Sequence, residues 1–313
     1  MMADRQLNES DPDRKGLRIG LFDSGAGGLS VLRQLVLSGV EASYVYIADA
    51  ARCPYGNRSA EEITAFAEQS AKWLAESAVD RIVMACNTSA AIAGNSMRNR
   101  IPVPMYDLIR PAALHCAGYK SVAILATSAT CRSKAFSLAI NAMNPAVAVS
   151  EIACPELVPL VEGGHLNDEL ADEAVQLCLR RLGAEKVDAV VLGCTHFPFL
   201  KEAFARQLGQ GIALVDPAEH LRLELFNDGA SVEAVSLPSD LYKRCTFFTT
   251  GCPDSFARTA ALCLGLDLDT FALNVCGISV NDLSSLAGPS AAAASPSATF
   301  ACQPCQSAAE LSR

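Results

Sequence analysis

The sequence predicts an α/β protein made of two duplicated, pseudo-symmetric domains with mostly parallel sheets and an active site in the cleft between them. Short apolar runs alternate with longer helical stretches from Arg18 onward, which is typical of parallel strands joined by helices. The segment "DRIVMACNTSA" (80–90) returns as "DAVVLGCTHFP" (188–198), and such an internal repeat indicates a duplicated architecture. With 313 residues the chain is also long enough to divide into two domains.

The elements of the first half can be assigned in order. The runs "RIGLFD" and "SYVYIA" are continuously apolar, as expected for strands that are covered on both faces of a parallel sheet. Between them "GGLSVLRQLVLSG" has the length and pattern of a helix. The next helix is expected to begin after Ser59, because Ser59 can cap it and Glu62 stands three residues further on, as in a capping box.

The repeat also sets the expected domain limits. "IGLFDSG" (19–25) resembles "VAILATS" (122–128), and "VPMYD" (103–107) resembles "IALVD" (212–216). We expect the following organisation: a polar N-terminal extension at 1–17, a first α/β domain at 18–109 plus 215–280, a second at 110–214, and a low-complexity, disordered tail at 281–313. The tail contains a lone "CQPC" (302–305), for which a solvated thiol pair is favoured over zinc because no second ligand pair follows.

Composition and charge exclude some classes of partner. The net charge is −9, whereas a nucleic acid or an anionic membrane attracts clustered Lys and Arg. No apolar run approaches the roughly 20 residues that a membrane helix needs, and the N-terminus lacks a signal-like apolar region. We therefore expect a cytoplasmic protein that binds neither nucleic acid nor membrane. The 13 cysteines are scattered through apolar segments, so most are expected to be core thiols.

Polar residues follow the apolar runs at four places. Ligands of open parallel sheets bind beyond the carboxyl ends of the strands, so these residues are expected to converge if the halves face each other. They are Asp23–Ser24, Cys86–Asn87–Thr88, Thr127 and Cys194–Thr195–His196.

Cys86 and Cys194 are the two candidate acid/base groups. Each stands where a strand gives way to a helix, and the helix N-terminus is expected to bring the thiol pKa toward physiological pH. Two buried core thiols are the plain alternative, but their equivalent places in the repeat favour a function. Zinc bound by Cys86, Cys194 and His196 is disfavoured because no further ligand pair lies nearby in the sequence.

The glycine-rich "DSGAGGLSV" (23–31) has two interpretations. The first is a phosphate-binding turn, although the segment lacks the spacing of a dinucleotide loop and the lysine of a P-loop. A tight turn whose backbone N–H groups approach a carboxylate fits equally well. Asp23 has a similar alternative, since an Asp in this place can simply cap the following helix, and "RCPYGNRS" (52–59) can be a plain turn or a ligand loop.

Taken together, the motifs resemble those of the glutamate racemases, in the cofactor-independent aspartate/glutamate racemase superfamily. The resemblance extends over about residues 18–275. It rests on six segments in the same order: "IGLFDSGAGGLSVL", "YIADAARCPYGNRS", "MACNTSAA", "LATSAT", "CPELVPLVEGG" and "LGCTHFPFL".

The resemblance implies that L- and D-glutamate are interconverted, for peptidoglycan, by two cysteines without pyridoxal phosphate or metal. Cys86 and Cys194 would act on opposite faces of the substrate Cα, with Asp23 assisting Cys86 and His196, tuned by Glu162, assisting Cys194. The substrate-binding positions would be Asp23, Ser24, Tyr55, Gly56, Asn87, Thr88, Thr127, Thr130, Thr195 and His196. The resemblance implies the small molecule glutamate as the binding partner and a homodimer as a possible assembly. Arg110 and "VDPAEH" (215–220) depart from the family's usual pattern.

Three other functions stay open at this point. A racemase of aspartate or another acidic amino acid is the near alternative. A hydrolase of small amides would need only Cys86 as nucleophile and His196 as base. A binding protein for dicarboxylic amino acids would bind without exchanging the α-proton.

Overall fold

The computed structural model describes residues 16–183, 186–226, 244–272 and 274–284. The "CQPC" at 302–305 and nearly all of the expected N-terminal extension and tail lie outside these ranges. The first part of the chain forms β1 (Leu17–Asp23), α1 (Leu29–Leu37), β2 (Ala42–Ala48), η1 (Ala50–Arg52), η2 (Tyr55–Asn57), α2 (Ala60–Glu76), β3 (Arg81–Met84), α3 (Asn87–Met97), β4 (Met105–Asp107) and α4 (Ile109–Cys116).

The chain then forms a second series of elements and returns to the first. The second series is β5 (Ser121–Ala126), α5 (Ser128–Ser133), α6 (Ala135–Met143), β6 (Ala148–Ala153), α7 (Leu157–Glu162), α8 (Glu169–Arg180), β7 (Ala189–Leu192), η3 (Phe197–Leu200), α9 (Lys201–Gln207), β8 (Ala213–Val215) and α10 (Pro217–Phe226). The returning part is β9 (Cys245–Thr249), α12 (Pro253–Leu264), α13 (Leu268–Ala272), β10 (Val275–Gly277) and α14 (Val280–Ser284).

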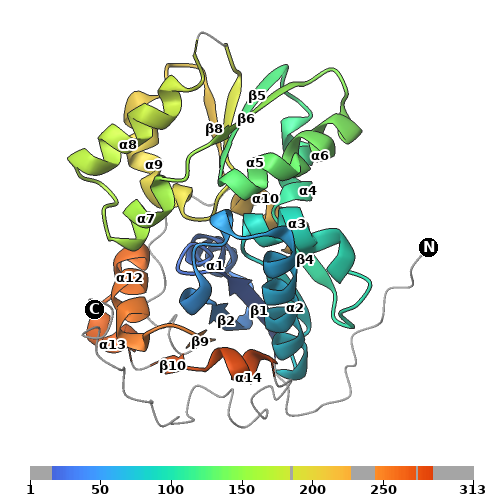
Figure 1. Ribbon diagram of the computed structural model, residues 1–313, viewed down its shortest axis with the longest axis vertical. Coiled ribbons are helices and arrows are strands. Elements are labelled where there is room, and N and C mark those ends of the chain that lie inside the picture. Colours follow the sequence, from blue (N-terminus) through green and yellow to red (C-terminus); the bar gives the residue numbers. More distant parts are fainter. Residues whose placement is uncertain (1–15, 184–185, 227–243, 273, 285–313) are drawn as a thin grey trace.

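Two parallel sheets organise these elements. The strand orders are β10-β9-β2-β1-β3-β4 and β6-β5-β7-β8, and the strand pairs in the described part of the chain are parallel. Helices lie around each sheet, with the second sheet above the first in Figure 1. The predicted α/β class with parallel sheets is confirmed.

The order of strands reflects the sequence repeat. Four strands of the first sheet run β2-β1-β3-β4, and the second sheet runs β6-β5-β7-β8, so β1 corresponds to β5 and β3 to β7. Strand β9 pairs with β2 and extends the first sheet. This pairing supports the proposal that residues 18–109 and 215–280 form one domain and 110–214 the other, which stays a prediction.

The repeated aspartates, Asp80 and Asp188, precede β3 and β7, so they lie at the opposite ends of these strands from the cysteines. The Asp80 carboxylate accepts a hydrogen bond from the backbone N–H of Arg18 at 2.8 Å. Asp188 does the same for Lys120 and Ser121, at 2.8 and 3.0 Å. Each aspartate therefore ties the start of one central strand to its neighbour, which is a structural role.

Two helices connect the halves, and they pack against each other. Helix α4 leads from the first sheet to the second and α10 leads back (Figure 1). Arg110 on α4 forms an exposed ion pair with Glu224 on α10 at 2.9 Å. Asp216, in the unusual "VDPAEH" segment, accepts from the N–H of Ala218 at 2.9 Å, and burial raises its pKa to about 7. Both departures from the family pattern thus lie at the connection between the halves.

Local features agree with the sequence in one place and differ in another. Ser59 caps α2, and a capping box with Glu62 is present as predicted. The tail was expected from residue 281, but α14 spans Val280–Ser284 and buries Leu283 completely. That expectation is wrong for 281–284, because one apolar side chain that packs in the core adds a helical turn to the fold.

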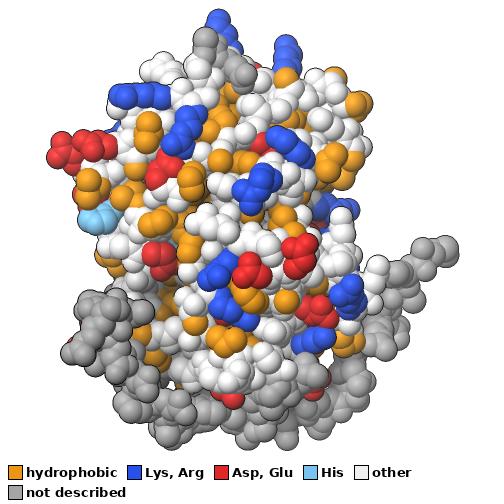
Figure 2. Space-filling model, in the orientation of Figure 1, with side chains coloured by type: hydrophobic (Ala, Val, Ile, Leu, Met, Phe, Trp, Pro, Cys, Tyr) orange, Lys and Arg blue, Asp and Glu red, His pale blue; other side chains and the backbone are white. Residues whose placement is uncertain are grey.

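The surface carries charges of both signs. On the face drawn in Figure 2, basic and acidic side chains alternate with apolar ones over the coloured part of the molecule. Among the described helices, none combines the length and the apolar character required to cross a bilayer.

The first prediction concerns the returning strand β9. Phe248 is 1% exposed, and its ring lies 4.8 Å from that of Trp73 on α2 in an edge-to-face contact. We expect Phe248→Ala to lower the free energy of unfolding by about 3–5 kcal/mol, since it removes a fully buried ring. Leu138→Ala, at a side chain that is 67% exposed, should change it by less than about 0.5 kcal/mol. Urea unfolding of both variants measures this, and equal losses would contradict the packing of β9 described here.

Candidate active site

The carboxyl ends of the two sheets bring Cys86 and Cys194 into one buried region between the halves. Cys86 follows β3 and is the N-cap of α3, where its sulfur accepts from the N–H of Ser89 at 3.5 Å. Cys194 stands two residues after β7. The side chains are 4% and 5% exposed. Negative charge on Cys194 contributes to the raised pKa of Cys86, so the two thiols are electrostatic neighbours.

The structure corrects the expected pKa of Cys86. The helix N-terminus was expected to lower it, and the hydrogen bonds from Ser89 do act in that direction. Burial outweighs them, with a further contribution from the charge of Asp23, and raises the pKa of Cys86 to about 12. In this arrangement Cys86 is a thiol, and it points its S–H toward Ser24 Oγ at 4.0 Å.

Cys194 has a different set of neighbours. Its sulfur lies 3.9 Å from Nδ1 of His196, and Nε2 of His196 donates to Glu162 Oε1 at 2.8 Å. Burial alone would lower the pKa of His196, but the hydrogen bonds and charges of Cys194 and Glu162 outweigh it and raise that pKa well above its usual value. Burial pushes the pKa of Glu162 up, yet His196 and the N–H of Ala26 hold it below its usual value. Contact with Glu162 and Cys194 therefore favours the protonated form of His196.

Asp23 links the two halves. One oxygen accepts from the N–H of Gly25 at 2.7 Å, and the other accepts from the hydroxyl of Thr195, from the second half, at 3.1 Å. Burial raises the pKa of Asp23 to about 6, although His196 opposes the shift. Its carboxyl group can thus change protonation within the range of physiological chemistry.

Three predicted threonines form a triangle of hydroxyl groups. The Oγ1 atoms of Thr88 and Thr127 are 2.9 Å apart, Thr130 lies 3.2 Å from Thr88 and 3.0 Å from Thr127, and all three are buried. Thr88 belongs to the first turn of α3, and Thr127 caps α5. Beside them, Oδ1 of Asn87 is buried and has no hydrogen-bond partner among the residues that the structure describes, and such an atom is suited to accept from a ligand.

The structure places Tyr55 and Gly56 on the same side of the site but in different roles. Tyr55 is buried in a small cluster with Cys86 and Ala129, while its hydroxyl donates to Asp49 and not toward the thiols. Gly56 lies so close to Thr127 that an added Cβ would come within 2.9 Å of the Thr127 side chain. A contact from this loop to a ligand would therefore come from its backbone or the ring of Tyr55.

The glycine-rich loop allows the second half to approach. A Cβ on Gly25 would lie 2.5 Å from Glu162 Oε1, and one on Gly27 would lie 2.3 Å from Nδ1 of His196. Between them the N–H of Ala26 donates to Glu162 at 3.0 Å. The loop is indeed a turn whose backbone meets a carboxylate, and that carboxylate is the protein's own Glu162.

Several side chains at the site were not predicted from the sequence. Ser30 donates to the carbonyl of Thr195 at 2.8 Å, and Tyr46 donates to the carbonyl of Gly25 at 2.9 Å. Asp49 and Thr250 hold the loop that carries Tyr55. Only Asp49 had a usable signal, because it follows an apolar strand just as Asp23 does.

This arrangement can move protons. It offers two thiols with separate partners, a carboxyl with a pKa of about 6, a buried histidine whose pKa is raised, and neutral hydroxyl and backbone donors. No three His, Cys, Asp or Glu side chains are grouped to hold a metal ion within the ranges that the structure describes.

Comparison with known proteins gives the family. The profile of the Asp/Glu/Hydantoin racemase family matches residues 29–221. Glutamate racemase 2 of Caldanaerobacter subterraneus is 35% identical over 254 residues, which are 80% of this chain and 94% of the relative. Two solved structures share 28% identity with a TM-score of 0.72. Glutamate racemase RacE1 of Bacillus anthracis aligns over 85% of this chain and 99% of its own, and the Francisella tularensis glutamate racemase in complex with D-glutamate over 86% and 99%.

The resemblance to glutamate racemases that the sequence motifs indicated is thereby confirmed. The chain belongs to the Asp/Glu/Hydantoin racemase family, and it is an amino-acid racemase, an isomerase.

Proposed function

We propose that the protein interconverts L- and D-glutamate by a two-base mechanism, with Cys86 and Cys194 on opposite sides of the substrate Cα. The observation that carries the proposal is that two buried thiols follow equivalent strands of the two sheets and meet at Asp23–Ser24. Ser24 lies beside Cys86, and Asp23 accepts from Thr195, the residue next to Cys194. Inversion of a carbon needs a proton acceptor on one face and a donor on the other, and a duplicated fold supplies one of each. The glutamate racemases to which the chain is similar support glutamate as the substrate.

The proton transfers balance without another reactant. One cysteine, as thiolate, takes the α-proton and becomes a thiol, which leaves a carbanion on Cα. The other cysteine, as thiol, gives its proton to the opposite face and becomes a thiolate. The α-ammonium of the amino acid brings positive charge beside the thiols, and a nearby opposite charge favours a thiolate. The ammonium thus offsets part of the effect of burial, which raises the pKa of Cys86.

The partners of the two thiols divide the remaining work. His196, held by Glu162, places Nδ1 beside Cys194, and its raised pKa favours a positive N–H there. Asp23, whose pKa is about 6, lies near enough to influence Cys86. We propose these three as further members of the catalytic set, together with substrate contacts from Ser24 and Thr195.

The hydroxyl triangle is suited to hold a carboxylate of the substrate. Thr88, Thr127 and Thr130 present neutral hydroxyl donors. Thr88 lies in the first turn of α3, where backbone N–H groups also favour an anion. Such fixed donors stabilise the negative charge that develops on the carboxylate side as Cα loses its proton. Asn87 Oδ1, an acceptor that no described residue engages, is suited to bind the ammonium. The backbone of Tyr55 and Gly56 is suited to bind the second carboxylate.

The wider setting follows the family. We propose that the enzyme uses no cofactor or metal, works in the cytoplasm and supplies D-glutamate for peptidoglycan, with a homodimer as the assembly to test by light scattering. Aspartate remains the alternative substrate, and side-by-side assays with both amino acids separate the two.

The central test uses deuterium. Incubation of the purified protein with L-glutamate in D₂O, without added cofactor, should yield D-glutamate that carries deuterium at Cα, because the returning proton comes from a solvent-exchanged thiol. Proton NMR and chiral chromatography measure both changes. Saturable binding without exchange would instead indicate a binding protein.

Substitution of each cysteine tests the two-base mechanism. We expect Cys86→Ser and Cys194→Ser each to lower the racemisation rate by at least about a hundredfold, since each removes one acid/base group. Cys252→Ser, at the N-cap of α12, is the matched control and should keep the wild-type rate. A Cys194→Ser protein that retains most of the turnover would point to chemistry at a single thiol.

The pH profile tests the role of Asp23. Burial raises the pKa of Asp23 to about 6, so this group is a carboxylate above that pH and becomes protonated below it. We expect kcat/KM to fall by about tenfold per pH unit below pH 6. The acid limb should disappear in Asp23→Asn and persist in Asp216→Asn, a control at another buried carboxyl. An unchanged limb in Asp23→Asn would remove Asp23 from the mechanism.

A further inference from the structure

We propose that Asp49 is a positioning residue, which holds the loop with Tyr55 and Gly56 against Cys86 and the hydroxyl triangle. The proposal rests on the proposed function, because it assigns to this loop a part in binding the substrate. Asp49 directly follows β2 and is completely buried.

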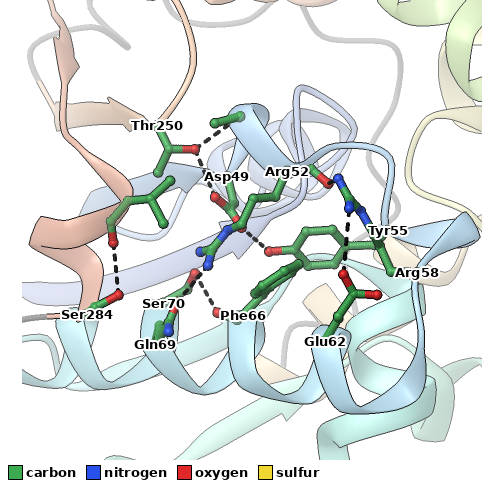
Figure 3. Close-up of polar contacts among 12 residues, drawn as sticks. Asp49, Arg52, Tyr55, Arg58, Glu62, Phe66, Gln69, Ser70, Thr250 and Ser284 are labelled. Carbon is green, nitrogen blue, oxygen red and sulfur yellow. Dashed lines mark hydrogen bonds and ion pairs between the residues drawn. The ribbon is translucent and has the colours of Figure 1, made fainter.

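The carboxylate of Asp49 gathers three donors from different segments (Figure 3). Arg52 Nε donates to Oδ2 at 2.6 Å, and the Tyr55 hydroxyl donates to the same oxygen. Thr250, just after β9, donates to Oδ1 at 2.8 Å. A buried carboxylate is stable when its oxygens are satisfied in this way. Both oxygens of Asp49 are thus engaged in holding the loop.

Arg52 also connects the loop to helix α2. Its Nη1 donates to Gln69 at 2.6 Å, and its guanidinium lies 4.0 Å from the centre of the Phe66 ring. Figure 3 shows Arg52 above the turn of α2 that carries both residues. Arg58, further along the loop, donates to the carbonyl of Arg52 at 3.4 Å. Arg52 therefore fixes the loop to α2, and Arg58 ties the end of the loop back to Arg52.

The fixed loop reaches the site at two points. The Tyr55 ring packs in the same small cluster as Cys86, and Gly56 lies against Thr127 of the second half. The backbone N–H of Asp49 also donates to the carbonyl of Asp23 at 2.9 Å. A shift of Asp49 would therefore move the Tyr55 ring beside Cys86, the loop backbone against the hydroxyl triangle, and the backbone of Asp23.

Thr250 adds a link to the returning part of the chain. Its hydroxyl oxygen also accepts from the N–H of Ala51 at 3.1 Å, so one threonine contacts both the carboxylate and the backbone of the loop. Through this contact the strand β9, which is far away in the sequence, helps to set the position of Tyr55.

The experiment compares three variants with a matched control. Tyr55→Phe removes one donor and keeps the ring, Thr250→Val removes the second, and Asp49→Asn leaves too few acceptor sites for all three. Asp188→Asn makes the same change in charge at the far edge of the second sheet. The measurements are kcat and KM for glutamate, melting temperature, and amide hydrogen exchange of residues 50–57.

We expect the KM of Tyr55→Phe and Asp49→Asn to rise about tenfold or more, the effect of losing one or two hydrogen bonds. Their kcat should change less than about threefold, because a substrate contact made equally before and during reaction affects KM alone. Thr250→Val should show a smaller rise of KM. Amide exchange of residues 50–57 should be faster in all three variants, and Asp188→Asn should match the wild type in KM and exchange.

Two outcomes would overturn the proposal. One is a fall in melting temperature with unchanged KM, which would make the network only structural. The other is an equal effect of Asp188→Asn on KM. If the wild type does not racemise glutamate, the proposed function fails by itself, and amide exchange then decides the anchor: faster exchange of 50–57 in Asp49→Asn but not Asp188→Asn supports it, and equal exchange refutes it.

Discussion

Burial of ionisable groups governs the chemistry of this protein. These groups lie where the carboxyl ends of the strands of two parallel sheets meet. Asp23, Cys86 and His196 are each at most 4% exposed, and an isolated charge in such a place is costly. Each group therefore either stays neutral or finds a partner. Burial favours the protonated thiol of Cys86, and Cys194 and Glu162 together raise the pKa of His196 against the effect of burial. Burial and the partners of each group together thus influence whether it holds its proton.

Close approach of the two halves makes this burial possible. Glu162 and His196 lie so close to Gly25 and Gly27 that a side chain at either glycine would clash with them. Between the glycines, the backbone N–H of Ala26 donates to Glu162. Ser30 and Asp23 add hydrogen bonds to Thr195 across the same boundary. The glycine-rich loop at 23–31 thus forms part of the contact between the two halves.

Duplication gives the site its symmetry but leaves its two sides chemically different. The equivalent strands β3 and β7 deliver Cys86 and Cys194, and the equivalent aspartates, Asp80 and Asp188, lock the starts of the strands at the other edge. Around the sulfurs the match ends, because Cys86 has Ser24 and Ser89 as neighbours and Cys194 has His196. Like groups on both faces suit an inversion, while unlike neighbours tune each thiol separately.

The amino-acid sequence by itself determined the α/β class, the internal repeat and the strand-end positions of Cys86 and Cys194, since these depend on local periodicity and on a similarity that can be read along the chain. The cap at Ser59 was equally local. Tertiary structure decided what depends on neighbours remote in sequence. The pKa of Cys86 was expected to fall but rises, because burial between the halves exceeds the effect of the helix N-terminus. The Tyr55 hydroxyl points to Asp49, and Thr250 joins them across 201 residues of chain. Burial and long-range hydrogen bonds are properties of the packed molecule, so no pattern along the chain could reveal them.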